Sequence, residues 1–192
     1  YKDFTGMESN LSYHTINVGT NAQAAVSDYL GNLVINQTLY EGTGSRMPLS
    51  IAATYNSINK DTAFENAQVS GYGWQFSFNQ YVREVTDKNL TKAGYNYIYT
   101  DADGTDHYLK LAEGETAKWE DEDGLGITLT KDENNIFIDN GSTTQTYDST
   151  ANGGKLLSEK DKHKNTITYT YTDGDLTKIT DGSGREVQLK YK

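Results

Sequence analysis

The sequence predicts an all-β fold, an antiparallel meander of consecutive β-hairpins that form an open, curved sheet. Short segments in which apolar and polar residues alternate recur along the chain. Many of these segments are separated by Asp-Gly or Asn-Gly dipeptides, which supply the positive φ angles that tight hairpins need. These dipeptides begin at residues 103, 123, 140, 152, 173 and 181. No segment has the apolar periodicity of a helix of three turns.

The composition indicates sheets with partly wet faces. A chain of 192 residues suits one large all-β domain, or one domain with an extension. Leu, Ile, Val and Phe together account for only 36 residues, but Tyr contributes 15 and Thr 24. Both of these types favour a pleated, half-buried surface, and Tyr adds a large apolar ring. We therefore expect tyrosines to take the place of missing aliphatic residues in the core.

The charge and the missing residue types exclude several function classes. The net charge is −10, so nucleic acid is not expected as a partner, because its phosphates are bound by Lys and Arg. The chain has no Cys for disulfides or thiol chemistry. It also has no run of about 18 apolar residues that would predict a membrane span. Because it begins at Tyr1, without Met or a signal-peptide core, we expect a piece of a longer polypeptide.

The N-terminal region, residues 1–94, is expected to form strands before any repeat begins. Strands are predicted at residues 12–18, 24–29, 33–39 and 49–55. Pro48 stands at the mouth of the last of these, where a missing N–H is tolerated. Residues 56–70 are predicted to be a long loop, with at most a helical turn at 61–68. A further strand is predicted over 75–82, with Trp74, Phe76 and Phe78 on one face.

Residues 95–192 are predicted to form strand-turn-strand repeats that continue beyond the fragment. Strands are expected at residues 97–100, 107–111, 127–130, 136–138 and 144–147. The same pattern then occurs twice in residues 156–191, at a spacing of 20 residues. The residues that define it are Leu156, Asp161, Ile167, Tyr169 and Tyr171 in the first copy, and Leu176, Asp181, Gly184, Arg185, Val187, Leu189 and Tyr191 in the second.

Several segments in this order and spacing resemble the Rhs/YD-repeat family. Those that look like the region before Rhs arrays are Gly6-Met7-Glu8, Ser12-Tyr13-His14, Gly31-Asn32-Leu33-Val34, Tyr55-Asn56-Ser57 and Gly71-Tyr72-Gly73-Trp74. Residues 99–105 are similar to the first strand-turn unit of that family, and residues 175–185 to a standard repeat. The Tyr-Asp step of the family is imperfect here, since Tyr171 is followed by Thr172-Asp173.

The resemblance implies a fragment of a large secreted or surface-displayed bacterial protein. In that family, which includes wall-associated proteins and the teneurins, hairpins spiral into a hollow β shell that encloses a C-terminal toxin or effector. This chain would be the N-terminal beginning of such a shell. Its partners would be downstream repeats and the effector of the same polypeptide, and its location would be the bacterial cell surface or the extracellular space.

The preferred functional hypothesis is a non-catalytic structural module without a cofactor. In a repeat array, a single hairpin cannot bury its face alone, and stability comes from stacking on neighbours. The open sheet edges of an excised fragment would invite self-association.

Two alternatives remain at this point. A cell-wall glycan could bind to an exposed aromatic surface formed by Tyr72, Trp74 and Trp119, although these side chains could equally fill the core. A glycoside-type hydrolase would need two carboxylates of different environment in one cleft, and the sequence nominates no pair.

No metal site is predicted. The stretch Asp101–Asp106 resembles the start of a calcium loop, but Asp106 stands where that loop needs Gly, and Ala112 where it needs Glu. The acidic run 120–123 is typical of a solvated loop. The three histidines, His14, His107 and His163, are too scattered to form a metal site.

Overall fold

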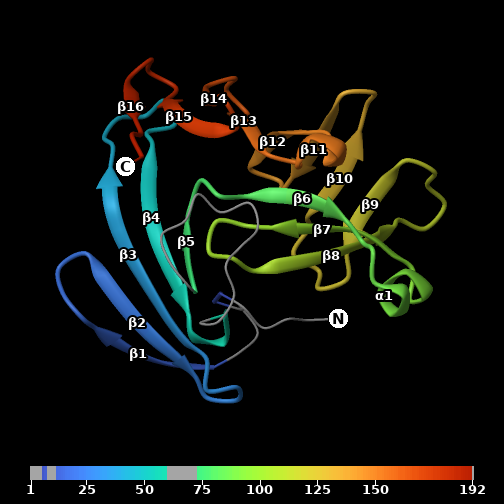
Figure 1. The fold of residues 1–192 in the computed structure, drawn as a ribbon, viewed down its shortest axis with the longest axis horizontal. Coiled ribbons are helices and arrows are strands. Elements are labelled where there is room, and N and C mark those ends of the chain that lie inside the picture. Colours follow the sequence, from blue (N-terminus) through green and yellow to red (C-terminus); the bar gives the residue numbers. More distant parts are fainter. Residues whose placement is uncertain (1–5, 8–11, 60–72, 192) are drawn as a thin grey trace. The chain divides into compact units, whose positions relative to one another are not determined.

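The computed structural model describes residues 6–7, 12–59 and 73–191, and it confirms the all-β meander (Figure 1). Sixteen strands lie in these ranges, arranged in two antiparallel sheets in which neighbours in sequence are neighbours in space. Neither sheet closes into a barrel. No helix in the described ranges is long and apolar enough to cross a membrane.

The first sheet has the order β1-β2-β3-β4-β5. Its strands are β1 (Tyr13–Asn17), β2 (Ala22–Ser27), β3 (Leu33–Glu41), β4 (Ser50–Asn56) and β5 (Trp74–Phe76). The strands predicted at residues 12–18, 24–29, 33–39 and 49–55 are all present with small shifts of their ends. The 3₁₀ turn η1 (Ser57–Asn59) follows β4. The predicted helical turn at 61–68 lies outside the described residues.

The second sheet has eleven strands, in order from β16 back to β6. They are β6 (Tyr81–Glu84), β7 (Tyr95–Thr100), β8 (Asp106–Leu111), β9 (Lys118–Asp121), β10 (Thr128–Lys131), β11 (Asn135–Asp139), β12 (Thr143–Asp148), β13 (Leu156–Asp161), β14 (Thr166–Thr172), β15 (Asp175–Thr180) and β16 (Glu186–Gln188). The short helices are α1 (Lys88–Lys92), which Asp87 caps through the N–H groups of Asn89 and Leu90, and η2 (Thr150–Asn152).

The strand predicted over 75–82 is instead divided between the two sheets. A turn after β5 places the N–H of Asn79 2.9 Å from the carbonyl oxygen of Phe76. The side chain of Gln80 closes the same turn with a hydrogen bond of 3.0 Å to Ser77 O. The alternating pattern of the segment is that of a single strand, and these two hydrogen bonds break it.

The chain packs into two compact units. Unit 1 consists of Tyr1–Gly42, Ser50–Gln80 and Thr100–Asp106. Unit 2 consists of Thr43–Leu49, Tyr81–Tyr99 and His107–Lys192. Both units are therefore discontinuous in sequence, and the predicted domain boundary at residue 94 stays a prediction.

Unit 1 buries a polar face of its sheet. Thr54, Asn56 and Gln75 are at most 1% exposed. Oδ1 of Asn56 accepts a hydrogen bond of 2.7 Å from the N–H of Gly6, and its amide group donates to Asp103 O at 3.2 Å. The amide of Gln75 donates to Asp101 O at 2.8 Å. These bonds offset the cost of burying polar groups.

The opposite face of that sheet carries a row of mainly apolar side chains. The strand register aligns one row across all five strands, formed by Ile16, Ala24, Ile35, Tyr55 and Trp74. Ala24 is buried, but Ile16 is 62% exposed, and the other three are half-buried. Antiparallel sheets more often bury the apolar face and leave the polar face in water. In unit 1, by contrast, side chains are buried on both faces, since Val34 lies on the face of Thr54 and Asn56, and Ile51 and Ala53 lie on the face of Tyr55.

Unit 2 has an apolar core in which aromatic rings substitute for aliphatic groups. Leu109, Leu129, Leu156 and Ile179 are fully buried, together with the large ring of Tyr147. Edge-to-face ring pairs connect strands that are not neighbours in the sheet. The centroids are 5.0 Å apart for Tyr97 of β7 and Trp119 of β9, and 5.9 Å apart for Tyr99 of β7 and Tyr147 of β12. Such pairs contribute about 0.5–1.5 kcal/mol beyond the buried area.

One backbone contact fixes the curvature of the second sheet. The first strand, β6, meets the segment before β13 through a bridge between Tyr81 and Lys155, and the N–H of Val82 donates to Gly154 O at 3.0 Å. Gly154 has a φ of +58°, and a Cβ atom there would lie 1.8 Å from Val82 O. Only glycine permits this approach.

Gly154→Ala should therefore destabilise the protein by about 3 kcal/mol, from the left-handed backbone and from steric displacement of β6. Gly126→Ala is the matched control, because Gly126 has a φ of +73° but no atom within 4 Å of the Cβ position. The control should lose only about 1 kcal/mol. Urea unfolding of both variants measures the difference. Equal losses would contradict the close approach.

Candidate functional site

The two copies of the tail pattern form the same turn twice. Oδ1 of Asp161 accepts hydrogen bonds from the N–H groups of residues 163 and 165, at 2.8 and 2.9 Å. Oδ1 of Asp181 accepts from residues 183 and 185, both at 2.9 Å. A short carboxylate side chain that binds its own turn in this way favours a hairpin over other local structures.

These hydrogen bonds stabilise the charged form of both carboxyl groups. The side-chain hydrogen bond from Asn165 is the main cause that lowers the pKa of Asp161. Burial acts to raise the pKa of Asp181, but the N–H groups of Arg185 and Ser183 and the Arg185 side chain together lower it. Both carboxylates are thus structural acceptors of the turn.

A tyrosine of each copy also binds a leucine carbonyl of the strand 15 residues earlier. The hydroxyl of Tyr171 donates to Leu156 O at 2.9 Å, and that of Tyr191 donates to Leu176 O at 2.7 Å. In both hairpins the register shifts next to this leucine, so that Leu157 and Thr177 are left unpaired as bulges. A bulge disrupts the ladder locally, and the tyrosine hydroxyl supplies a hydrogen-bond donor beside it.

Burial of the pattern residues falls from the first copy to the second. Ile167 and Tyr169 of the first copy are buried, whereas Val187 and Leu189 of the second are half-buried and Tyr191 is 47% exposed. The reason is position, because β14 lies between two strands and β16 is the last strand of the sheet. The pKa of Tyr171 is raised mainly by burial and to a lesser extent by the neighbouring Tyr191.

The turn at Asp181 makes further contacts through Arg185, and the turn at Asp161 has the shorter Asn165 at the equivalent position. Nε of Arg185 donates to Asp181 Oδ2 at 2.7 Å, as Asn165 does to Asp161 at 2.8 Å, and Nη2 of Arg185 also donates to Thr43 O. A Cβ atom at Gly182 would lie 2.0 Å from Arg46 O. The second turn therefore holds the segment 43–49 of unit 2. Gly184, with a φ of +84°, completes the turn in open space.

The aromatic side chains predicted as a binding surface lie in different places. Trp119 is buried in unit 2, where its Nε1 donates to Asn96 Oδ1 at 3.1 Å. Trp74 is half-buried in unit 1, with its ring 5.4 Å from that of Tyr55. Tyr72 lies outside the described residues. Neither unit contains both tryptophans.

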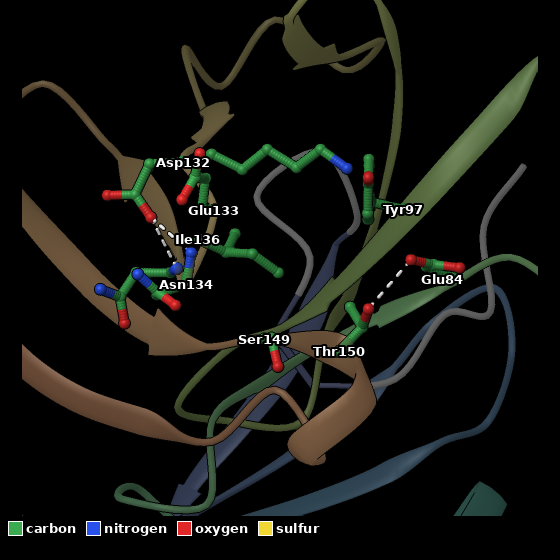
Figure 2. A pocket seen from close by; sticks show the side chains of 10 residues that line it. Glu84, Tyr97, Asp132, Glu133, Asn134, Ile136, Ser149 and Thr150 are labelled. Atoms are coloured by element: carbon green, nitrogen blue, oxygen red, sulfur yellow. Dashed lines mark hydrogen bonds between the residues drawn. The ribbon is translucent and has the colours of Figure 1, made fainter.

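Unit 2 also has a polar pocket of about 110 Å³ (Figure 2). Four segments supply its lining: β6, β7, the hairpin from the end of β10 to the start of β11, and the residues after β12. The lining residues are Glu84, Tyr97, Lys131, Asp132, Glu133, Asn134, Asn135, Ile136, Ser149 and Thr150. Thr150 and Glu84 are joined by a hydrogen bond of 2.9 Å. No spacing in the sequence could have indicated this grouping.

The charged groups of the pocket are largely engaged within the protein. A hydrogen bond with Tyr97 raises the pKa of Lys131, whose ammonium group lies 5.7 Å from the Tyr97 ring and 5.8 Å from the Trp119 ring. Oδ1 of Asp132 accepts from the N–H groups of Asn134 and Asn135, which lowers its pKa. The arrangement can hold a small polar molecule, but a general acid would need a carboxyl group with a raised pKa.

Metal-ligating side chains do not gather in the part of the chain that the structure describes, where no group of three His, Cys, Asp or Glu residues could hold an ion. His107 is buried and stacks on Tyr99, while His14 pairs with Asp28. Oδ1 of Asp101 accepts from the N–H groups of Asp103 and Thr105, so this stretch forms a hydrogen-bonded turn.

A family model described as a domain of unknown function (DUF6531) matches residues 24–109, from β2 into β8. The match stops before the repeated tail. No curated protein matches the chain.

Tyr171→Phe should lower the free energy of unfolding by about 1–2 kcal/mol, because Leu156 O then loses the hydroxyl donor. Tyr29→Phe is the control, since Tyr29 is 80% exposed and its substitution should change stability by less than about 0.5 kcal/mol. Urea unfolding gives both values. If Tyr171→Phe were as stable as the control, the repeated hydrogen bond would not stabilise the array.

Proposed function

We propose that this chain is a non-catalytic structural segment built as an array of β-hairpins. The observation that carries the proposal is the recurrence of one set of contacts at a spacing of 20 residues. Tyr171 binds Leu156 and Tyr191 binds Leu176, while Asp161 and Asp181 close equivalent turns. Within each copy, these contacts join the two strands of one hairpin, β13–β14 or β15–β16. The two hairpins then pair with each other through β14 and β15, which is the physical logic of a repeat array.

In the proposed assembly, the array is part of a shell of a large secreted or cell-surface bacterial protein. The shell encloses or displays a C-terminal toxin or effector, and the partners of this segment are further repeats and that effector. Two observations support this assembly: the resemblance of the sequence to Rhs/YD-repeat proteins, and the order of the second sheet. That sheet runs from β6 to β16 without a crossover, so hairpins can be added at its end.

The role of the acidic side chains supports the non-catalytic part of the proposal. Asp132, Asp161 and Asp181 each accept backbone hydrogen bonds that lower the carboxyl pKa. Side chains committed to turns in this way are not available as proton donors. Glu122 likewise binds Lys110 and Tyr95, and its pKa is lowered, first by Lys110.

A glycan-binding role is the second candidate, and the half-buried Trp74 favours it. This ring lies beside that of Tyr55 on the apolar, partly exposed face of unit 1. A sugar ring can stack on such an aromatic face. Titration with soluble cell-wall fragments distinguishes the two candidates, because the array proposal expects no change in tryptophan fluorescence, and a glycan site expects a saturable change that Trp74→Ala abolishes.

Adding a hairpin tests the array proposal directly. When a further copy of residues 173–192 is appended after Lys192, it should pair with β16 and bury Leu189 and Tyr191. We expect a higher urea midpoint for unit 2 and several-fold slower amide exchange in β16.

The matched control carries the same extension with Ser in place of the residues equivalent to Leu176 and Tyr191. This extension has the same length, but it cannot make the buried contact or the hydrogen bond. If both extensions slowed exchange in β16 equally, or if neither did, the proposed stacking of hairpins would be refuted.

A further inference from the structure

The hairpin between β11 and β12 contains an Asn-Gly step that is held by side-chain-to-backbone hydrogen bonds. The two strands pair up to Asp139 and Thr144, and residues 140–142 form the exposed turn. Asn140 supplies a side-chain amide, and the following Gly141 supplies a backbone nitrogen. These are the two groups that react with each other when an asparagine loses its amide.

Two backbone donors polarise the amide of Asn140. Its Oδ1 accepts hydrogen bonds from the N–H of Ser142 at 3.0 Å and from the N–H of Thr143 at 2.9 Å. When a nucleophile attacks Cγ, negative charge develops on this oxygen. Fixed N–H donors that point at such an oxygen stabilise the charge, as in an oxyanion hole.

The carboxylate of Asp139 is hydrogen-bonded to the N–H of Gly141, the nitrogen that would act as the nucleophile. The N–H of Gly141 donates to Asp139 Oδ1 at 2.6 Å. Gly141 has no side chain, and no atom lies within 4 Å of its Cβ position. The backbone nitrogen of Gly141 thus has a hydrogen-bonded base, and no side chain of its own hinders it, which is the arrangement of general base catalysis.

We propose that Asn140 is a site of intramolecular deamidation assisted by Asp139. The carboxylate of Asp139 takes the proton of Gly141 N, and this nitrogen forms a bond to Cγ of Asn140. The resulting oxyanion is held by the N–H groups of Ser142 and Thr143. The bond from Cγ to Nδ2 then breaks, Nδ2 receives the proton, and ammonia leaves. Water opens the succinimide ring to give aspartate or isoaspartate.

The second Asn-Gly step of the described chain lacks these features, so it is an internal control. The N–H of Gly153 donates to a peptide carbonyl, Thr150 O, at 3.1 Å, and this oxygen is a poor base. The amide of Asn152 donates from Nδ2 to Asp148 Oδ1 at 3.3 Å. No described N–H group donates to Oδ1 of Asn152. The same dipeptide therefore lies in two different chemical settings.

Deamidation of Asn140 would alter the array at the hairpin between β11 and β12. Isoaspartate adds a methylene group to the backbone of a tight turn, which is incompatible with the observed pairing of Asp139 with Thr144. Either product also places a negative charge beside Asp139. The modification would therefore loosen β12, whose Tyr147 is fully buried in unit 2.

The test follows both asparagines in the full chain during incubation at mildly alkaline pH. Peptide mass mapping reports the loss of each amide, and enzymatic methylation reports isoaspartate. We expect Asn140 to react about tenfold or more faster than Asn152, the low end of what an assisting base contributes. Asp139→Asn should slow the reaction at Asn140 and leave that at Asn152 unchanged.

Two results would overturn the proposal. One is equal rates at Asn140 and Asn152 in the unmodified chain. The other is an undiminished rate at Asn140 in the Asp139→Asn variant. The rate at Asn152 in this variant also shows whether the fold is intact, because unfolding would accelerate it.

Discussion

The hydrogen bond from a tyrosine hydroxyl to a leucine carbonyl of an earlier strand is the interaction on which the repeated part of unit 2 depends. It joins Tyr171 to Leu156 and Tyr191 to Leu176. Each leucine side chain is buried, and its carbonyl lies beside a bulge, where the ladder is disrupted. The tyrosine ring fills space as an aliphatic side chain would, and its hydroxyl is a local donor. One residue type thus serves packing and polar satisfaction together.

The scarcity of aliphatic residues has a different consequence in unit 1. There the sheet buries Thr54, Asn56 and Gln75. Asn56 is hydrogen-bonded to Gly6 and to Asp103 O, the amide of Gln75 donates to Asp101 O, and Oγ1 of Thr54 accepts from Asn36. The apolar row from Ile16 to Trp74 lies on the partly exposed face. Buried polar networks of this kind specify one arrangement strongly, because any shift of register leaves several groups without partners. Unit 1 thus depends on hydrogen bonds for its register, whereas unit 2 depends on rings and bulges.

The sequence predicted the local part of this structure well, since hairpins are local. The Asp-Gly and Asn-Gly steps located turns, and the 20-residue match identified Asp161 and Asp181 as equivalent residues. The break between β5 and β6 was missed, because it depends on hydrogen bonds within residues 76–80. The pocket was also missed, since its lining residues come from segments far apart in sequence. Alternation could not reveal that Thr54, Asn56 and Gln75 of unit 1 are buried polar residues.

Amide hydrogen exchange across β12 to β16 is the most direct test of the claim that each hairpin stabilises its neighbour. In a stacked array, the last element has a neighbour on one side only, so it opens most readily. Protection should therefore be highest in β13 and β14, lower in β15 and lowest in β16. If β16 were protected as strongly as β13, the tail would be one rigid body, and the stepwise account would be contradicted.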